Sequence, residues 1–172
     1  REASEGATIK VVIMATGVTS RYEDQRDRSD EIESLVSESR RANAELGVDD
    51  VVFGGFPDQK LDTIPFFDLV KFIRAIVDEF RPDVAYTHHA GDYNLDHRLL
   101  YDAVVVSTRP ALGEHHPTEL YSFEVLSSTE WQPQSTFTPQ RYVDVKGTIG
   151  AKKTAMAVYA SELRDYPHPR SI

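Results

Sequence analysis

Short apolar runs rich in β-branched residues alternate along this chain with longer segments whose apolar residues recur every three to four positions. Continuous runs of that kind are typical of parallel strands buried on both faces, and the periodic segments predict amphipathic helices. The alternation predicts an α/β doubly wound fold with a mostly parallel sheet. The expected strands are Ile9–Met14, Val51–Phe53, Val84–Thr87, Leu120–Val125 and Arg141–Val145, and the expected helices cover 29–46, Ile64–Phe80, Arg98–Ser107 and Ile149–Leu163.

Capping and turn residues refine the ends of these elements. Ser29 or Asp30 is expected to cap the first helix, which Gly47 ends. A loop is expected at Gly54–Asp58, and the residue before Pro82 is expected to end the second helix. The spacing of that helix assigns four aromatic residues to the core, namely Phe66, Phe67, Phe72 and Phe80.

Composition excludes several classes of function. The 172 residues suffice for one core-bearing domain, and we expect a single domain over 1–172. Without cysteine the chain has no disulfide and no thiol ligand, so any metal site must use His, Asp or Glu. A net charge of −9 disfavours nucleic acid as a partner. No run of about 18 apolar residues is present to span a bilayer, and the chain is expected to be cytoplasmic.

The densest polar cluster directly follows the third expected strand. Residues 88–98 read HHAGDYNLDHR and hold three of the six histidines. Ligands of doubly wound sheets bind at the carboxyl ends of the strands, and imidazole and carboxylate groups are suitable ligands for a divalent metal. Asp96 and His97 are therefore candidates for one ligand and its neighbour. The alternative is structural, with Asp96 capping the helix and His97 covering its first turn.

Other polar residues at strand ends and near the C-terminus carry weaker signals. Arg21 follows the first strand and is placed to meet a substrate hydroxyl or phosphate, although an ordinary polar loop explains it as well. Asp58 is suited to bind hydroxyl groups of a ligand or to form a turn after Pro57. His168 and Arg170 lie in a segment stiffened by two prolines, which suits a rigid substrate-facing loop.

A nucleotide- or phosphate-binding domain is a rival hypothesis, with Gly54-Gly55 as the phosphate cradle. The chain has no G-x-G-x-x-G or P-loop pattern to support it. His115 and His116 are expected in a solvent-exposed loop without a role.

The segment HHAGDYNLDHR resembles the second motif of the PIG-L / LmbE-like metal-dependent N-deacetylases, which remove acetyl groups from N-acetylglucosamine-type substrates. VVIMATGVTSR, ANAELGVDDVVFGGFPDQKLD and KKTAMAVYASELRDYPHPRS are similar to further strands, helices and loops of that family in the same order. The resemblance spans nearly the whole chain. It implies a Rossmann-like fold and a small N-acetylated sugar or glycoconjugate as partner, and a homo-oligomer is compatible with it.

The resemblance also implies roles for individual residues. His97 would be a metal ligand, as the last histidine of the family's His-x-Asp-His pattern, and Asp96 would tune the metal or one of its ligands. Asn94 stands where the family has the first histidine, and its amide can donate to an oxyanion but cannot carry a proton at neutral pH. His88 or His89 would take over that role, and the sequence leaves open which.

The family's His-Pro-Asp-Asp-Glu motif, which supplies two metal ligands and the general base, does not occur in this sequence. The first expected strand corresponds to the family's second, and both ends of the chain read as truncated. We therefore expect the chain alone to bind metal weakly and to be inactive. For the intact protein we expect deacetylation of an N-acetylated sugar with Zn²⁺ or another divalent metal. The alternative is a catalytically inactive sugar-binding domain of the same fold.

Overall fold

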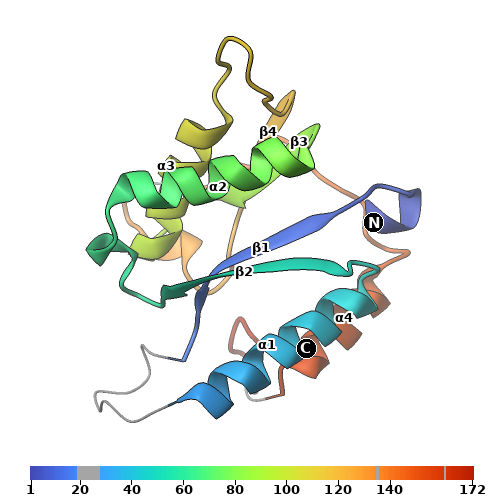
Figure 1. Cartoon of the computed structure of the whole chain (residues 1–172). Helices are drawn as coiled ribbons and strands as arrows, with labels where there is room; N and C mark the ends of the chain where they lie inside the picture. Colours follow the sequence, from blue (N-terminus) through green and yellow to red (C-terminus); the bar gives the residue numbers. More distant parts are fainter. Residues whose placement is uncertain (19–27, 135, 161) are drawn as a thin grey trace. The chain divides into compact units, whose positions relative to one another are not determined.

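The computed structural model describes residues 1–18, 28–134, 136–160 and 162–172 (Figure 1). The chain divides into two compact units. The first unit consists of Arg1–Asp58 and Pro139–Ile172, and the second consists of Gln59–Thr138.

The first unit is built around two parallel strands. β1 (Lys10–Thr16) pairs with β2 (Asp50–Pro57), beginning at Lys10 opposite Asp50. Helix α1 (Ser29–Glu45) lies between the two strands in sequence, and α4 (Ile149–Val158) packs against it. A parallel pair needs such a crossover because a short turn cannot return the chain in the same direction. Met14, Ala42, Val48 and Val51 are among the buried apolar residues of this unit.

The two consecutive glycines of β2 accommodate an irregularity in the strand pairing. One extra residue of β2 is inserted between the partners of Ile13 and Ala15, which is a β-bulge. A Cβ on Gly54 would lie 2.8 Å from the carbonyl oxygen of Met14, and Gly55 has a positive φ of 69°. The loop expected at Gly54–Asp58 is therefore wrong up to Pro57, because the strand continues through the bulge. The close approach of the two strands and the positive φ therefore explain Gly54 and Gly55, which the rival hypothesis assigned to phosphate binding.

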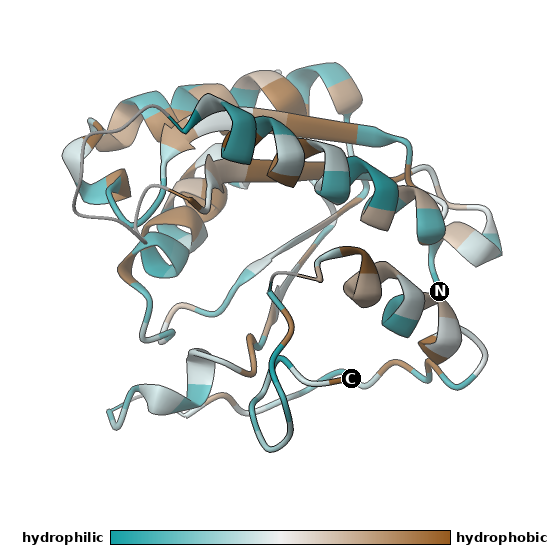
Figure 2. Ribbon diagram, turned by 90° about the horizontal axis from the view of Figure 1, so that it is seen from below, coloured by the Kyte–Doolittle hydropathy of each residue, from teal (hydrophilic) through white to brown (hydrophobic). Residues whose placement is uncertain are grey.

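The second unit combines a parallel strand pair with two packed helices. β3 (Val84–His88) pairs with β4 (Glu119–Phe123), and α3 (Leu95–Thr108) connects them. α3 packs against α2 (Phe66–Phe80), whose buried face consists of Leu69, Val70, Ile73 and Val77. Hydrophilic and hydrophobic residues alternate along the helices in Figure 2, as expected for helices with one packed and one exposed face. Short 3-10 turns, η3 (Leu61–Thr63) and η4 (Thr129–Trp131), precede α2 and follow β4.

Three expectations about elements are wrong. Arg141–Val145 does not form a strand, and Tyr142 within it is 82% exposed, because an alternating run becomes a strand only where a neighbouring edge offers hydrogen bonds. α4 ends at Val158 rather than at Leu163, since Tyr159 leaves helical backbone geometry. Phe66 and Phe67 are exposed by 38% and 62%, because they form the first turn of α2, before its packed face begins.

The α/β class and the parallel pairing expected from the sequence are confirmed. Formation of a single domain over 1–172 stays a prediction. Among the described residues, no helix combines the length and the apolar character needed to cross a membrane.

Candidate functional site

Two histidines meet at the carboxyl end of β3. His88 is the last residue of that strand, and His97 lies in the first turn of α3. Their rings stack, with centroids 4.1 Å apart and planes inclined by 21°. His89 instead contacts Phe137 edge-on, with centroids 5.2 Å apart. Of the two histidines that the sequence left open, His88 is the one that lies against His97.

Asp92 provides the carboxylate beside this pair, and its side chain is fully buried. Its Oδ1 lies 3.2 Å from Nδ1 of His97 and accepts the backbone N–H of Asn94 at 2.8 Å. Its Oδ2 accepts the hydroxyls of Ser128 at 3.0 Å and Thr129 at 2.8 Å. The loop after β3, the start of α3 and the segment after β4 therefore converge on one carboxylate.

These hydrogen bonds determine the charge of Asp92. Burial by itself would raise the pKa of Asp92, but the hydrogen bonds from Asn94, Thr129, Ser128 and His97 hold it below its ordinary value. Asp92 is therefore ionised at neutral pH. Because an ionised carboxylate only accepts hydrogen bonds, Nδ1 of His97 must carry the proton that faces it. In the neutral form of the ring, the lone pair then resides on Nε2.

His88 is kept neutral by its surroundings. Burial lowers the pKa of His88 to about 4, His97 lowers it as well, and Asp92 acts in the opposite direction. Its ring also lies against Phe123, with centroids 5.1 Å apart. At neutral pH His88 can donate or accept a hydrogen bond or bind a metal, but it holds no positive charge.

Asn94 caps helix α3. Its side-chain oxygen accepts the backbone N–H of Asp96 at 2.9 Å, which satisfies one of the donors at the start of the helix. The expected alternative of an Asp96 cap is therefore wrong. The cap uses the amide oxygen of Asn94 and leaves its NH₂ as the group that would donate to an oxyanion.

Asp96 is buried and contacts the backbone ahead of α2. It accepts the N–H of Gln59 at 2.7 Å and the N–H of Leu61 at 3.2 Å. Asp96 thus connects the start of α3 to this loop, whereas Asp92 is the carboxylate that contacts His97. Tuning of a metal by Asp96 stays a prediction. The role of Asp92 could not be predicted from the sequence, because its pairing with His97 depends on the loop conformation before the helix and on residues after β4.

The remaining candidates belong to the first unit, while the histidine pair belongs to the second. Arg21 lies outside the described residues. Asp58 follows β2 in a turn. Arg170 forms an ion pair with Glu162 at 2.9 Å, and its backbone N–H donates to Nδ1 of His168 at 3.0 Å. Substrate binding by these residues stays a prediction.

The residues of this histidine–carboxylate cluster are suited to form part of a metal site. Nε2 of His97 and the neutral ring of His88 are suitable nitrogen donors, and a carboxylate on Nδ1 is a typical support for a metal-bound histidine. Within the described parts of the chain, however, no group of three or more His, Asp or Glu side chains is placed to hold a metal ion.

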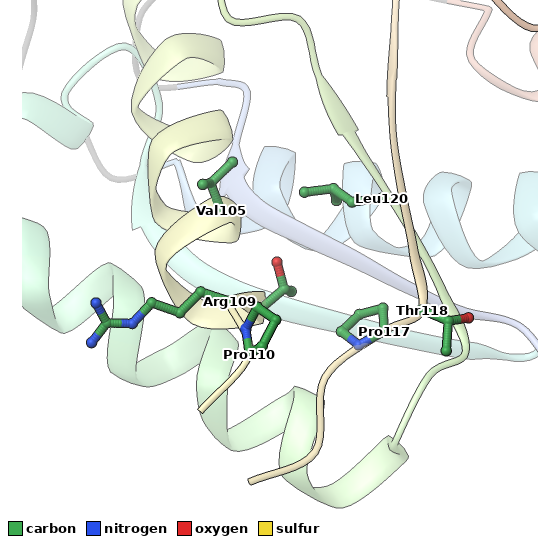
Figure 3. A pocket seen from close by; sticks show the side chains of 7 residues that line it. Val105, Arg109, Pro110, Pro117, Thr118 and Leu120 are labelled. Carbon is green, nitrogen blue, oxygen red and sulfur yellow. The ribbon is translucent and has the colours of Figure 1, made fainter. Parts of the chain in front are cut away.

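A cavity of about 310 Å³ lies at the opposite end of the β3–β4 strand pair (Figure 3). It is lined by Val105, Thr108, Arg109, Pro110, Pro117, Thr118 and Leu120. No histidine or carboxylate lines it, and ligands of parallel sheets bind at the carboxyl ends of the strands. Close to this region, His115 is half-buried and bonds through Nε2 to the carbonyl of Pro82 at 2.9 Å, so the expectation that it is exposed is wrong.

Solved structures with the same fold cover nearly all of this chain. The conserved protein TT1542 from Thermus thermophilus is 20% identical, with a TM-score of 0.68 over 94% of this chain and 70% of that chain. N,N′-diacetylchitobiose deacetylase from Pyrococcus horikoshii is 21% identical, with a TM-score of 0.66 over 95% of this chain and 63% of that chain. GalB, the 4-carboxy-2-hydroxymuconate hydratase from Pseudomonas putida KT2440, is 19% identical, with a TM-score of 0.72 over 94% of this chain and 70% of that chain.

The fold and the site together define a Rossmann-like α/β protein with a histidine–carboxylate cluster at the carboxyl end of a parallel strand. The PIG-L family, described as GlcNAc-PI de-N-acetylase, matches the chain over residues 1–107. The chain belongs to this family of deacetylase-like hydrolases. A comparison with curated proteins finds no match.

Proposed function

We propose that this chain is the catalytic domain of a zinc-dependent deacetylase that hydrolyses the acetamide of an N-acetylglucosamine-type sugar or glycoconjugate. The observation that carries the proposal is the Asp92–His97 contact, which leaves Nε2 of His97 as a lone-pair donor at the carboxyl end of β3. Family membership supports the reaction class. The fold alone does not, because one fold hosts unrelated chemistries and a hydratase shares this one.

His97 would hold the metal through Nε2, and neutral His88 stands beside it as a second nitrogen donor. When bound there, Zn²⁺ or another divalent metal supplies polarisation of the acetyl carbonyl and activation of water. The resemblance assigns the general base to a His-Pro-Asp-Asp-Glu motif, which this sequence does not contain.

Asn94 and His88 would stabilise the oxyanion that develops when the acetamide is attacked. The NH₂ of Asn94 and an imidazole N–H of His88 are neutral donors, and removing one such donor lowers the rate by roughly 10²–10³-fold. Because the pKa of His88 is about 4, we assign it hydrogen bonding rather than proton donation at neutral pH. His89, on the neighbouring backbone position, is the alternative donor.

On the substrate side we propose Arg21, Asp58, His168 and Arg170 as contacts for the sugar and its substituents. A guanidinium offers paired donors to a phosphate or to vicinal oxygens. We also propose a cytoplasmic location and a small-molecule substrate. A nucleic-acid partner is not proposed, because the net charge of −9 disfavours binding to a phosphate backbone. Homo-oligomer formation stays a prediction.

A catalytically inactive sugar-binding domain is the second candidate. The observation that favours it is that the described residues provide no group of three metal donors. In such a domain, sugar affinity would not depend on metal. The two candidates therefore differ in their response to a chelator.

A deacetylation assay tests the proposal. The chain, alone and within the natural full-length protein where that is longer, is incubated with Zn²⁺ and N-acetylglucosamine, N,N′-diacetylchitobiose or an N-acetylglucosamine-linked inositol phospholipid, and released acetate is measured. We expect acetate from at least one substrate in the longest form, and loss of that activity with chelator or with His97→Gln. Sugar binding that persists in chelator without any acetate release would favour the inactive domain instead.

A further inference from the structure

We propose that Asp92, held by Ser128 and Thr129, is a positioning residue that fixes His97 in its Nδ1–H form and thereby presents Nε2 for metal binding. The expected effect on metal affinity rests on the proposed function. Which ring nitrogen of His97 carries the proton can be tested without metal.

The first step is the rigidity of the Asp92 carboxylate. The side chain has no exposed surface, and both of its oxygens accept hydrogen bonds. Oδ1 faces the N–H of Asn94 and Nδ1 of His97, while Oδ2 faces two hydroxyls. A buried carboxylate with donors on both oxygens has little freedom to rotate, because rotation would leave polar groups unpaired.

The second step is the anchoring of the two hydroxyls. Thr129 is fully buried, and its hydroxyl oxygen accepts the N–H of Val125 at 2.6 Å while its proton goes to Asp92. The N–H groups of Ser128 and Thr129 both donate to the carbonyl of Val125 at 2.9 Å, and the carbonyl of Ser128 accepts the N–H of Tyr93 at 3.3 Å. The turn after β4 is therefore bonded internally and to the loop after β3.

The third step concerns where the proton of His97 lies. Nδ1 is 3.2 Å from Oδ1 of Asp92 and 3.4 Å from Oγ of Ser128. Because the Ser128 proton is directed to Asp92, its oxygen is also an acceptor toward the ring. Two acceptors facing Nδ1 favour the N–H there, although the neutral histidine side chain in water prefers its proton on Nε2. Stacking on His88 fixes the plane of the ring, so the contacts determine both the orientation and the tautomer of His97.

A simpler role would use the same contacts, since Asp92 also closes a local turn through the N–H of Asn94. A purely structural carboxylate would change stability when replaced but would leave the His97 tautomer and zinc affinity unmoved. The two roles are therefore separable by spectroscopy and by titration with zinc alone.

The closing experiment begins with the metal-free wild-type chain, labelled with ¹⁵N-histidine and held in chelator at pH 7.5. Long-range ¹H–¹⁵N spectra report which ring nitrogen is protonated, and the His97 signals are assigned by their loss in His97→Gln. We expect a protonated Nδ1 and an unprotonated Nε2. A protonated Nε2 on His97 overturns the proposal, whether or not the protein is a deacetylase.

Zinc titration by calorimetry tests the consequence. Asp92→Asn is expected to shift His97 toward the Nε2–H form and to weaken zinc binding about 10–100-fold, and Ser128→Ala to weaken it less, about 3–10-fold. Thr108→Ala removes a buried hydroxyl bonded to the Val104 carbonyl and should leave zinc affinity unchanged. If Asp92→Asn does not fold, the zinc affinity of Ser128→Ala and the His97 tautomer in the wild-type spectrum test the proposal.

Unchanged zinc affinity in Ser128→Ala and in every folded Asp92 variant overturns the positioning role. A His97 tautomer of the expected form in a natural full-length protein that binds no zinc supports the structural assignment and counts against the proposed function. The failures of the two proposals are thus distinguishable.

Discussion

Asp96 accepts the backbone N–H groups of Gln59 and Leu61, at 2.7 and 3.2 Å, so that the first turn of α3 holds the loop ahead of α2. Gln59 has a positive φ of 55°, a backbone conformation that needs such support in a residue other than glycine. Leu61 is almost fully buried beside this contact. The carboxylate is therefore a structural link within the second unit.

Replacing Asp96 is predicted to destabilise the protein. Asp96→Ala leaves two backbone N–H groups without this acceptor and should lower the free energy of unfolding by about 2–4 kcal/mol. Asp96→Asn keeps one acceptor oxygen and should cost about 1–2 kcal/mol. Urea denaturation of metal-free protein measures both, with exposed Asp62→Ala in the same segment as the control. Unchanged stability in Asp96→Ala, together with weaker zinc binding, would show that tuning the metal is its principal role.

Substitutions of Asn94 and His97 are predicted to have different effects on metal content and turnover. In the natural full-length protein, His97→Gln should remove metal and activity together, because it deletes a ligand. Asn94→Ala should keep the metal, lower turnover by roughly 10²–10³-fold and cost about 1 kcal/mol of stability through the lost cap. Metal content, deacetylation rate and thermal unfolding are measured on the same samples.

Asn94→Asp is the matched control for the cap. It retains an acceptor oxygen for the N–H of Asp96 but lacks the NH₂ donor. We expect the stability of the wild type with a turnover as low as that of Asn94→Ala. Wild-type turnover in Asn94→Asp would assign Asn94 to capping alone, and loss of metal in Asn94→Ala would make it part of the metal site.

Much of the fold was predictable because local patterns determine it. The apolar runs predicted β1 and β3 to within a few residues, and the stripe ending before Pro82 predicted the end of α2. The polar loop between β3 and α3 was predictable as the site region, because parallel strands place ligands at their carboxyl ends. Patterns of period two failed at Arg141–Val145, where pairing with a neighbour, not the pattern, decides the structure.

The contacts inside the site were not predictable from the sequence. Ser128 and Thr129 reach Asp92 from the segment after β4, and no spacing rule relates them. The choice between His88 and His89 depends on the direction of each side chain at the end of β3, where the first ring lies against His97 and the second against Phe137. Tertiary packing decides such contacts, and it is not encoded in any one segment.

The low pKa of His88 predicts that stability depends on pH. Its folded pKa is about 4 and its ordinary value is 6.5, so between these values the unfolded chain binds the proton more readily. Stability should therefore fall as pH drops from about 6.5 to 4, by roughly 1–3 kcal/mol at full effect. Asp92, whose pKa is lowered, loses its contribution only at still lower pH. Urea denaturation in chelator at several pH values measures this, and His88→Phe should flatten the dependence; an equally steep fall in that variant would assign it to other groups.

Arg170 is predicted to govern substrate affinity. In the intact protein, Arg170→Ala should raise KM several-fold while zinc content stays unchanged. The effect should be larger on substrates that carry a phosphate, because a guanidinium binds phosphate with paired donors. Glu162→Gln releases the guanidinium from its ion pair and should not raise KM. A truncation before Tyr166 that leaves KM unaltered for every acetylated sugar tested would exclude this segment from substrate binding.

Gly54 is predicted to tolerate no side chain, because of the bulge in β2. A Cβ there would lie 2.8 Å from the carbonyl oxygen of Met14 and 3.2 Å from its Cα, both backbone atoms of the paired strand, so Gly54→Ala should destabilise the protein by about 1–3 kcal/mol. Gly150→Ala is the matched control, since that glycine lies in the first turn of α4 with open space at its Cβ position and should gain roughly 0.5–1 kcal/mol. Denaturation of both variants in phosphate-free buffer and in phosphate separates packing from ligand binding. A phosphate-dependent stability difference confined to Gly54→Ala would revive the phosphate cradle, whereas the same loss in both buffers assigns the glycine to strand pairing.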